Sequence, residues 1–221
     1  MEKSCLVTAS LISSISWTQT APNTIIKSEK GGDGVTTWKV KAIQDLKNTL
    51  ARKPFTPNDA AKHGIVFENA LYKKMSQNIF KDPDSSDFFN EILSRLAGGQ
   101  VQRKNGKQMV IGEYNCYLYA KEDVYFPDKI IDIKTTEKYS REKYTGSIQH
   151  YLYSVVEDIY TFEYLVAEWK KYPEIKSVYG VALQYTKKEA LAMVEEVVKE
   201  AFAFLKKTDL WDLYRDSYCL Y

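Results

Sequence analysis

An acid and a base lie two residues apart in an otherwise apolar, β-branched run. The run reads Ile130-Ile131-Asp132-Ile133-Lys134-Thr135-Thr136. If it forms a strand, Asp132 and Lys134 share one face, because successive side chains of a strand point to opposite faces. Burying such charges costs several kcal/mol unless they are paired or liganded. A metal-assisted catalytic site would supply the ligand, and a solvated sheet edge or a local ion pair is the alternative.

Three further segments carry polar residues at spacings that suit chemistry. In chain order they are His63-Gly64-Ile65-Val66-Phe67-Glu68, Val110-Ile111-Gly112-Glu113-Tyr114-Asn115 and Gln149-His150-Tyr151-Leu152-Tyr153. Gly64 and Glu68 are four residues apart, as are Gln149 and Tyr153, so each pair shares a face if its segment is helical. An ordinary surface carboxylate is the alternative for Glu68.

In this order, the four segments resemble the PD-(D/E)XK nuclease superfamily, and specifically its RecB-like branch, which includes phage recombination exonucleases. The pattern of that branch is a helical Gly-x-x-x-Glu, a strand with Gly-x-x-Asp, a strand with Asp/Glu-x-Lys and a helix with Gln-x-x-x-Tyr. The resemblance runs from about Ser10 to Tyr153. It implies an α/β fold with a restriction-endonuclease-like core, in which α-helices flank a mixed central β-sheet.

The resemblance also implies a function, namely metal-dependent hydrolysis of phosphodiester bonds, with DNA as partner and exonuclease action as the expected mode. Glu68 and Asp132 would hold Mg²⁺ or Mn²⁺. Lys134 would position the attacking water or help to deprotonate it. Gln149 and Tyr153 would orient the site or touch the nucleic-acid backbone.

One position departs from the pattern, because Asn115 stands where the family has the Asp of Gly-x-x-Asp. An amide oxygen can bind a hard cation, but a full negative charge is lost. We expect the strand that carries Asn115 to lie antiparallel to the strand that carries Asp132. Glu113 would lie on the same strand as Asn115, about 7 Å from it, and could serve as a partial substitute ligand. Impaired activity is therefore expected, and an inactive nuclease-fold protein that binds DNA or another partner is the alternative.

Basic and aromatic residues interleave directly after the Asp132 strand. The expected contacts with phosphates and unpaired bases are Lys138, Arg141, Lys143 and Tyr144. An amphipathic segment whose tyrosines pack on the core is the alternative. Ser10 is a further expected nucleic-acid contact, since its segment resembles the Ser-rich entry of RecB-like domains. With two histidines a His-based metal cluster is not expected, and His63 and His150 are interpreted as polar surface groups.

Periodicity and turn residues predict the elements that position these side chains. The pair Asn105-Gly106 predicts a hairpin turn, and Lys27 to Gly34 a loop. The predicted helices cover residues 37–51, a stretch from 56 onward, 86–96, 147–158 and 187–206, with strands near 162–169 and 177–184. Aromatic residues crowd the end of the chain, and either local packing or a subunit contact would explain them, so a homo-oligomer stays open.

Composition limits the class of protein. The chain has 221 residues, 44% of them hydrophobic, which suits one globular domain with a buried core. We divide it into an N-terminal helical or loop extension (1–55), a motif-bearing core (56–160) and C-terminal strands with covering helices (161–221). The net charge of +2 is too small to predict nucleic-acid binding, so DNA contact would need a local patch.

Three scattered cysteines, Cys5, Cys116 and Cys219, argue against a disulfide framework and against a four-cysteine metal or cluster site. The sequence has no apolar run long enough to span a bilayer, and its start lacks the pattern of a signal peptide. We therefore expect a cytoplasmic protein.

Overall fold

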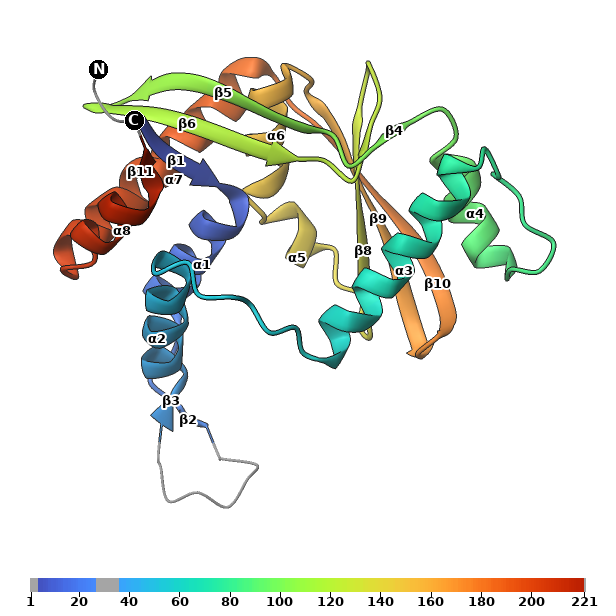
Figure 1. Cartoon of the computed structure of the whole chain (residues 1–221), viewed down its shortest axis with the longest axis horizontal. Coiled ribbons are helices and arrows are strands. Elements are labelled where there is room, and N and C mark those ends of the chain that lie inside the picture. The colour runs from blue at the N-terminus through green and yellow to red at the C-terminus, as the bar shows by residue number, and fades with distance from the viewer. Residues whose placement is uncertain (1–3, 27–35, 221) are drawn as a thin grey trace. The chain divides into compact units, whose positions relative to one another are not determined.

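The computed structural model describes residues 4–26 and 36–220 (Figure 1). The loop expected from Lys27 to Gly34 lies outside the described residues. No helix within the described part of the chain is long and apolar enough to cross a membrane.

The chain forms two compact units. The first consists of Met1–Pro54, Gly106–Tyr119 and Leu191–Tyr221, and the second of Phe55–Asn105 and Ala120–Ala190. The chain therefore passes between the units four times, and three of these passages fall within regular elements, which are β5 (Lys104–Ile111), β6 (Tyr114–Lys121) and α7 (Lys187–Lys207). The single domain expected from length stays a prediction.

The second unit is built around a five-stranded mixed sheet with the order β10-β9-β8-β7-β4. Its strands are β4 (Gln100–Val101), β7 (Val124–Tyr125), β8 (Ile130–Thr136), β9 (Thr161–Lys171) and β10 (Glu174–Gln184). The pair β8 and β9 is parallel, and the other pairs are antiparallel. The long β9–β10 hairpin is drawn in orange in Figure 1.

Helices cover both faces of this sheet. They are α3 (Asp59–Ser76), α4 (Asp87–Arg95), α5 (Glu142–Thr145) and α6 (Gln149–Glu157). Leu71 of α3 and Ile92 of α4 share one core cluster with Ile131 and Ile133 of β8. Ile130 belongs to a second cluster, which also contains residues of α5 and β9. The alternation along β8 therefore separates two cores, and the expected α/β fold with a mixed sheet flanked by helices is confirmed.

The helix starts have ordinary causes. Asn58 caps α3 by accepting a hydrogen bond from the Ala61 amide, and Asp59 supplies an acid to the first turn. Ser86 caps α4 in the same way, through the amide of Phe89. These caps fix where α3 begins and hence which of its residues face the sheet.

The first unit contains a four-stranded sheet with the order β11-β1-β6-β5. Besides β5 and β6, its elements are β1 (Ser4–Thr8), α1 (Ala9–Thr20), α2 (Trp38–Leu50), α8 (Trp211–Tyr218), β11 (Cys219–Leu220) and the small pair β2 (Ile25–Ile26) and β3 (Thr36–Thr37). Cys5 lies opposite Cys219 on one side and Cys116 on the other, and all three are buried free thiols. Tyr214 and Tyr218 of α8 are buried and stack locally, at 5.5 Å between ring centroids.

One predicted turn is wrong. Asn105 and Gly106 lie within the continuous strand β5, and the turn falls at Gly112 and Glu113, where Gly112 adopts a positive φ of 61°. Gly106 serves a different purpose, because a Cβ there would lie 2.1 Å from the hydroxyl of Tyr117. Glycine thus admits an aromatic ring across the strand instead of making the turn.

Candidate active site

Asp132 is the most deeply buried carboxylate of the candidate site. It lies on β8 with 2% of its surface exposed. Its Oδ1 accepts a hydrogen bond from Nε2 of Gln149 at 2.6 Å, and its Oδ2 forms an ion pair with the Lys134 ammonium. The acid and the base predicted to share a strand face do so, and α6 supplies the amide that holds the acid in place.

Asp123 lies beside these residues, immediately before β7. Val124 pairs with Ile131 in antiparallel register, and continuing this register by one residue brings Asp123 opposite Asp132. The Asp123 Oδ2 accepts a hydrogen bond from the Ile133 amide at 2.9 Å. The carboxylate is thereby fixed to the strand that carries the Asp-x-Lys motif.

Sequence reasoning missed Asp123, although a signal was present. The segment Ala120-Lys121-Glu122-Asp123 repeats the family spacing Gly-x-x-Asp with alanine in place of glycine. The segment Gly112 to Asn115 keeps the glycine of the motif but ends in asparagine. Asp123 is therefore a second candidate, besides Asn115, for the aspartate position of the motif.

Asn115 and Glu113 do not lie where they were expected. The predicted pairing of the Asn115 strand with the Asp132 strand is wrong, because β6 pairs with β1 and β5 while β8 pairs with β7 and β9. Glu113 lies in the turn before β6 rather than in the strand, is exposed, and forms an ion pair with Lys206 at 3.1 Å. The reason for expecting impaired activity disappears with this pairing.

Glu68 lies on α3 and is half-buried. Burial raises its pKa to about 7, with Asp123 and Asp132 adding to the rise and Lys134 opposing it. Burial also raises the pKa of Asp132, against the opposing effect of Lys134. The carboxylates of Glu68 on α3, Asp123 just before β7 and Asp132 on β8 therefore influence one another electrostatically.

The base of the motif is held in its charged form. Burial lowers the pKa of Lys134, but the carboxylates of Asp132 and Asp123 outweigh this effect, so the pKa ends above its ordinary value. Lys134 thus contributes a positive charge to an otherwise acidic site.

The donor set suits a hard divalent cation in its chemistry. Glu68, Asp123 and Asp132 offer carboxylate oxygens, which Mg²⁺ prefers. The raised pKa values of Glu68 and Asp132 show that burial and neighbouring carboxylates disfavour the charged forms of these two groups. As they are placed, no three His, Cys, Asp or Glu side chains within residues 4–26 and 36–220 are grouped closely enough to ligate one ion. The Lys134 ammonium lies against Asp132 instead.

The remaining expected residues have mixed outcomes. Gln149 contacts Asp132 directly, and Tyr153, four residues later on α6, is half-buried near Phe162, with its pKa raised by burial and by Asp132. Ser10 is exposed on α1 and belongs to the first unit.

The basic segment after β8 divides into exposed cations and buried rings. Lys138, Arg141 and Lys143 are exposed. Tyr144 is only 3% exposed, with its ring 5.4 Å from that of Tyr164. The expectation that Tyr144 stacks on unpaired bases is wrong, since its ring is part of the protein core.

The surface position expected for His150 is also wrong. His150 is 1% exposed, its Nδ1 lies 3.2 Å from the Tyr164 hydroxyl, and burial lowers its pKa to about 4. An unfolded chain protonates histidine near pH 6.5. Between these pH values the unfolded state binds more protons, so the free energy of unfolding falls as the pH falls through this window.

We therefore expect the free energy of unfolding to fall by about 3 kcal/mol between pH 7 and pH 4 because of His150 alone. Urea unfolding of the parent and of His150→Asn at pH 7.5, 5.5 and 4.5 measures this. The variant should lose less stability than the parent on acidification. Equal losses in the two proteins would contradict a buried, neutral histidine.

The chain was compared with known protein families, curated sequences and solved structures. The chain matches no model of a protein family and no curated protein sequence. Among solved structures it is similar to LHK-Exo in complex with dAMP, with a TM-score of 0.50, 13% identity and coverage of 95% of this chain and 92% of that chain. LHK-Exo is an alkaline exonuclease from Laribacter hongkongensis.

A phage-related exonuclease from Haemophilus somnus 129PT is also similar, with a TM-score of 0.47, 14% identity and coverage of 94% and 96% of the two chains. At such identities the likeness concerns the fold. The chain therefore has a fold similar to that of LHK-Exo, as the resemblance to nucleases predicted.

Proposed function

We propose that the chain is a metal-dependent nuclease that hydrolyses phosphodiester bonds in DNA, acting as an exonuclease. The observation that carries the proposal is the pairing of β7 with β8, which sets Asp123 beside Asp132 and Lys134. A buried acid, a second acid opposite it and a charged lysine suit phosphoryl transfer better than a structural ion pair, which would need only one acid.

Each residue has a role in this proposal. Glu68, Asp123 and Asp132 would hold Mg²⁺ or Mn²⁺, and when bound such an ion polarises the scissile phosphate and acidifies a bound water. Gln149 holds the Asp132 carboxylate in one orientation through its 2.6 Å hydrogen bond. The Lys134 ammonium offsets negative charge that develops on the phosphate oxygens.

We further propose that the exposed side chains Lys138, Arg141 and Lys143, which follow β8, contact phosphates of the DNA. The similar fold of LHK-Exo, described in complex with dAMP, supports a deoxynucleotide as the ligand class. Tyr144, being buried, has no part in this contact.

The test is hydrolysis of labelled linear duplex DNA and of covalently closed circular DNA, each with Mg²⁺, with Mn²⁺ or with a chelator. We expect shortening of the linear DNA with either metal, none with the chelator, and an intact circle. Cutting of the circle would replace the exonuclease mode with an endonuclease mode. If neither DNA is cut while DNA still binds with salt dependence, the inactive DNA-binding alternative holds.

A further inference from the structure

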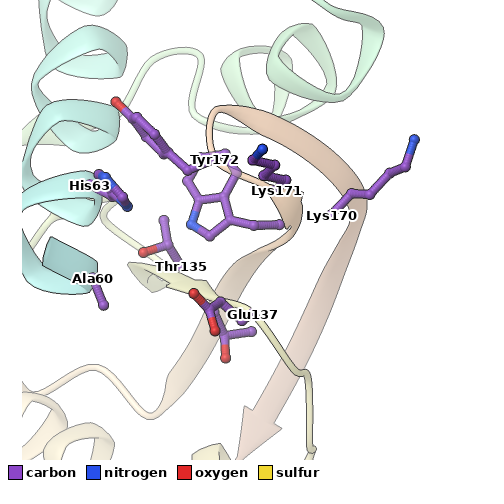
Figure 2. A pocket seen from close by; sticks show the side chains of 9 residues that line it. Ala60, His63, Thr135, Glu137, Lys170, Lys171 and Tyr172 are labelled. Atoms are coloured by element: carbon purple, nitrogen blue, oxygen red, sulfur yellow. The ribbon is translucent and has the colours of Figure 1, made fainter. Parts of the chain in front are cut away.

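A pocket of about 470 Å³ lies at the end of β8, and nothing in the proposed chemistry uses it. Among its lining residues are Ala60, His63, Thr135, Glu137, Trp169 and Tyr172 (Figure 2). Its volume is within the range of small-molecule sites. We call it the His63–Tyr172 pocket.

The pocket is built from the two elements that carry the candidate catalytic residues. Ala60 lies two turns, or about 12 Å, before Glu68 on α3. Thr135 and Thr136 directly follow Lys134 and are the last two residues of β8. Their side chains point to opposite faces of the strand, and both line the pocket, so the pocket lies at the end of β8. A substrate strand that places one phosphate at the carboxylates therefore has the pocket within its reach.

One wall of the pocket is aromatic. The rings of His63 and Tyr172 stack with centroids 3.7 Å apart and planes 2° apart, and Trp169 meets Tyr172 edge to face at 5.4 Å. Figure 2 shows His63 and Tyr172 side by side, with Thr135 beneath them. Preformed aromatic surfaces of this kind bind flat π-systems, and nucleobases stack on them with little regard to sequence.

The charged residues of the lining affect how the pocket can bind the base and the phosphate of a nucleotide. The exposed carboxylate of Glu137 lies in the lining and repels phosphate. A carboxylate does accept hydrogen bonds from the exocyclic amino groups of bases. Lys170 and Lys171, which are also in the lining, supply positive charge for a neighbouring phosphate. The lining thus offers an acceptor for the amino group of a base and cations for the phosphate attached to it.

From these observations we propose that the His63–Tyr172 pocket binds an unpaired nucleobase of the substrate strand near the bond that is cut. A base within a duplex is stacked on both faces, so the pocket takes only a base that has left the helix. The inference deepens the proposed function and rests on it, because it assumes that nucleic acid is the substrate.

The test uses single-stranded DNA oligonucleotides that carry the fluorescent base 2-aminopurine at the end or at successive positions from it. Stacking in the pocket quenches this base. Binding is measured with the chelator present, so that no cleavage is required. With the parent chain we expect quenching at one or a few adjacent positions.

Two variants remove the pocket in opposite ways. Tyr172→Ala deletes the stacking surface, and Ala60→Trp fills the pocket from an exposed helix position, where the fold is little disturbed. Both should abolish quenching, and Tyr172→Ala should weaken binding roughly tenfold or more. Tyr172→Phe keeps the ring, and Phe55→Ala removes an aromatic side chain that is 79% exposed outside the pocket; both should behave as the parent does.

The outcomes separate this inference from the proposed function. If the parent cuts linear DNA but Tyr172→Ala and Ala60→Trp keep parental quenching and binding, the pocket proposal is overturned and the nuclease proposal stands. If the parent binds with position-dependent quenching that both variants lose, the pocket proposal is supported even where cleavage is absent. If the parent shows no quenching at any position, the pocket does not bind a base.

Discussion

Asp123→Asn is expected to lower the rate of metal-dependent DNA cleavage by at least about 100-fold, since even residues that only orient metal ligands contribute 10- to 100-fold. The substitution removes one negative charge from the proposed donor set. It keeps an oxygen that accepts the hydrogen bond from the Ile133 amide, so the pairing of β7 with β8 should persist. Initial rates on linear duplex DNA, measured across a range of Mn²⁺ concentrations, give the effect.

Asn115→Asp is the matched control, because it introduces a carboxylate at the other candidate position for the family motif. Since β6 does not pair with β8, this variant should cleave at the parental rate. The two substitutions therefore test which segment carries the Gly-x-x-Asp role. A gain of activity in Asn115→Asp together with normal activity in Asp123→Asn would restore the original sequence interpretation.

Lys134→Gln is expected to reduce cleavage by roughly 100- to 1,000-fold, the usual loss when a group that stabilises transition-state charge is removed. Glutamine keeps a hydrogen-bond donor near the buried Asp132 carboxylate, so folding should be largely preserved. Because only the charge at the reacting phosphate changes, DNA affinity should stay near the parental value. Rates at saturating DNA, together with a separate binding titration, distinguish these effects.

Lys73→Ala is the control for Lys134, since Lys73 is an exposed lysine of α3 that takes no part in the proposed site. Its cleavage rate should match that of the parent. Lys134→Arg should remain poor, because a planar guanidinium does not reproduce a compact ammonium at a crowded position. Parental activity in Lys134→Gln would remove lysine from the mechanism.

Local patterns in the sequence predicted those elements whose position depends mainly on one local cause, such as burial of alternate residues or a helix cap. The alternation along β8 follows directly from burial of Ile131 and Ile133 on one face, and the start of α3 follows from its cap. Asp132, Lys134 and Gln149 could be found in this way because their spacing is local. The resemblance implied that Gln149 orients the site or touches the nucleic-acid backbone, and the structure shows its hydrogen bond to Asp132.

Interactions between distant segments decided what the sequence did not predict. Asn105-Gly106 has strong turn chemistry, but the ring of Tyr117 occupies the space above Gly106 and the strand continues. His150 and Tyr144 are amphipathic residues whose burial depends on neighbours from β9, chiefly Tyr164. Asp123 was not predicted because Ala120 stands where the Gly-x-x-Asp pattern has glycine.

The division of the chain between the two units also sets an order for folding during synthesis. Residues 55–190 contain all of the second unit, together with the segment 106–119 of the first unit, so the sheet of the second unit can form before residues 191–221 are made. Strand β1 is made well before its neighbours β6 and β11 in the same sheet. During synthesis β1 therefore remains an apolar strand with two unpaired edges until β6 and β11 are available. We expect slow synthesis or chaperones to affect yield mainly through folding of the first unit.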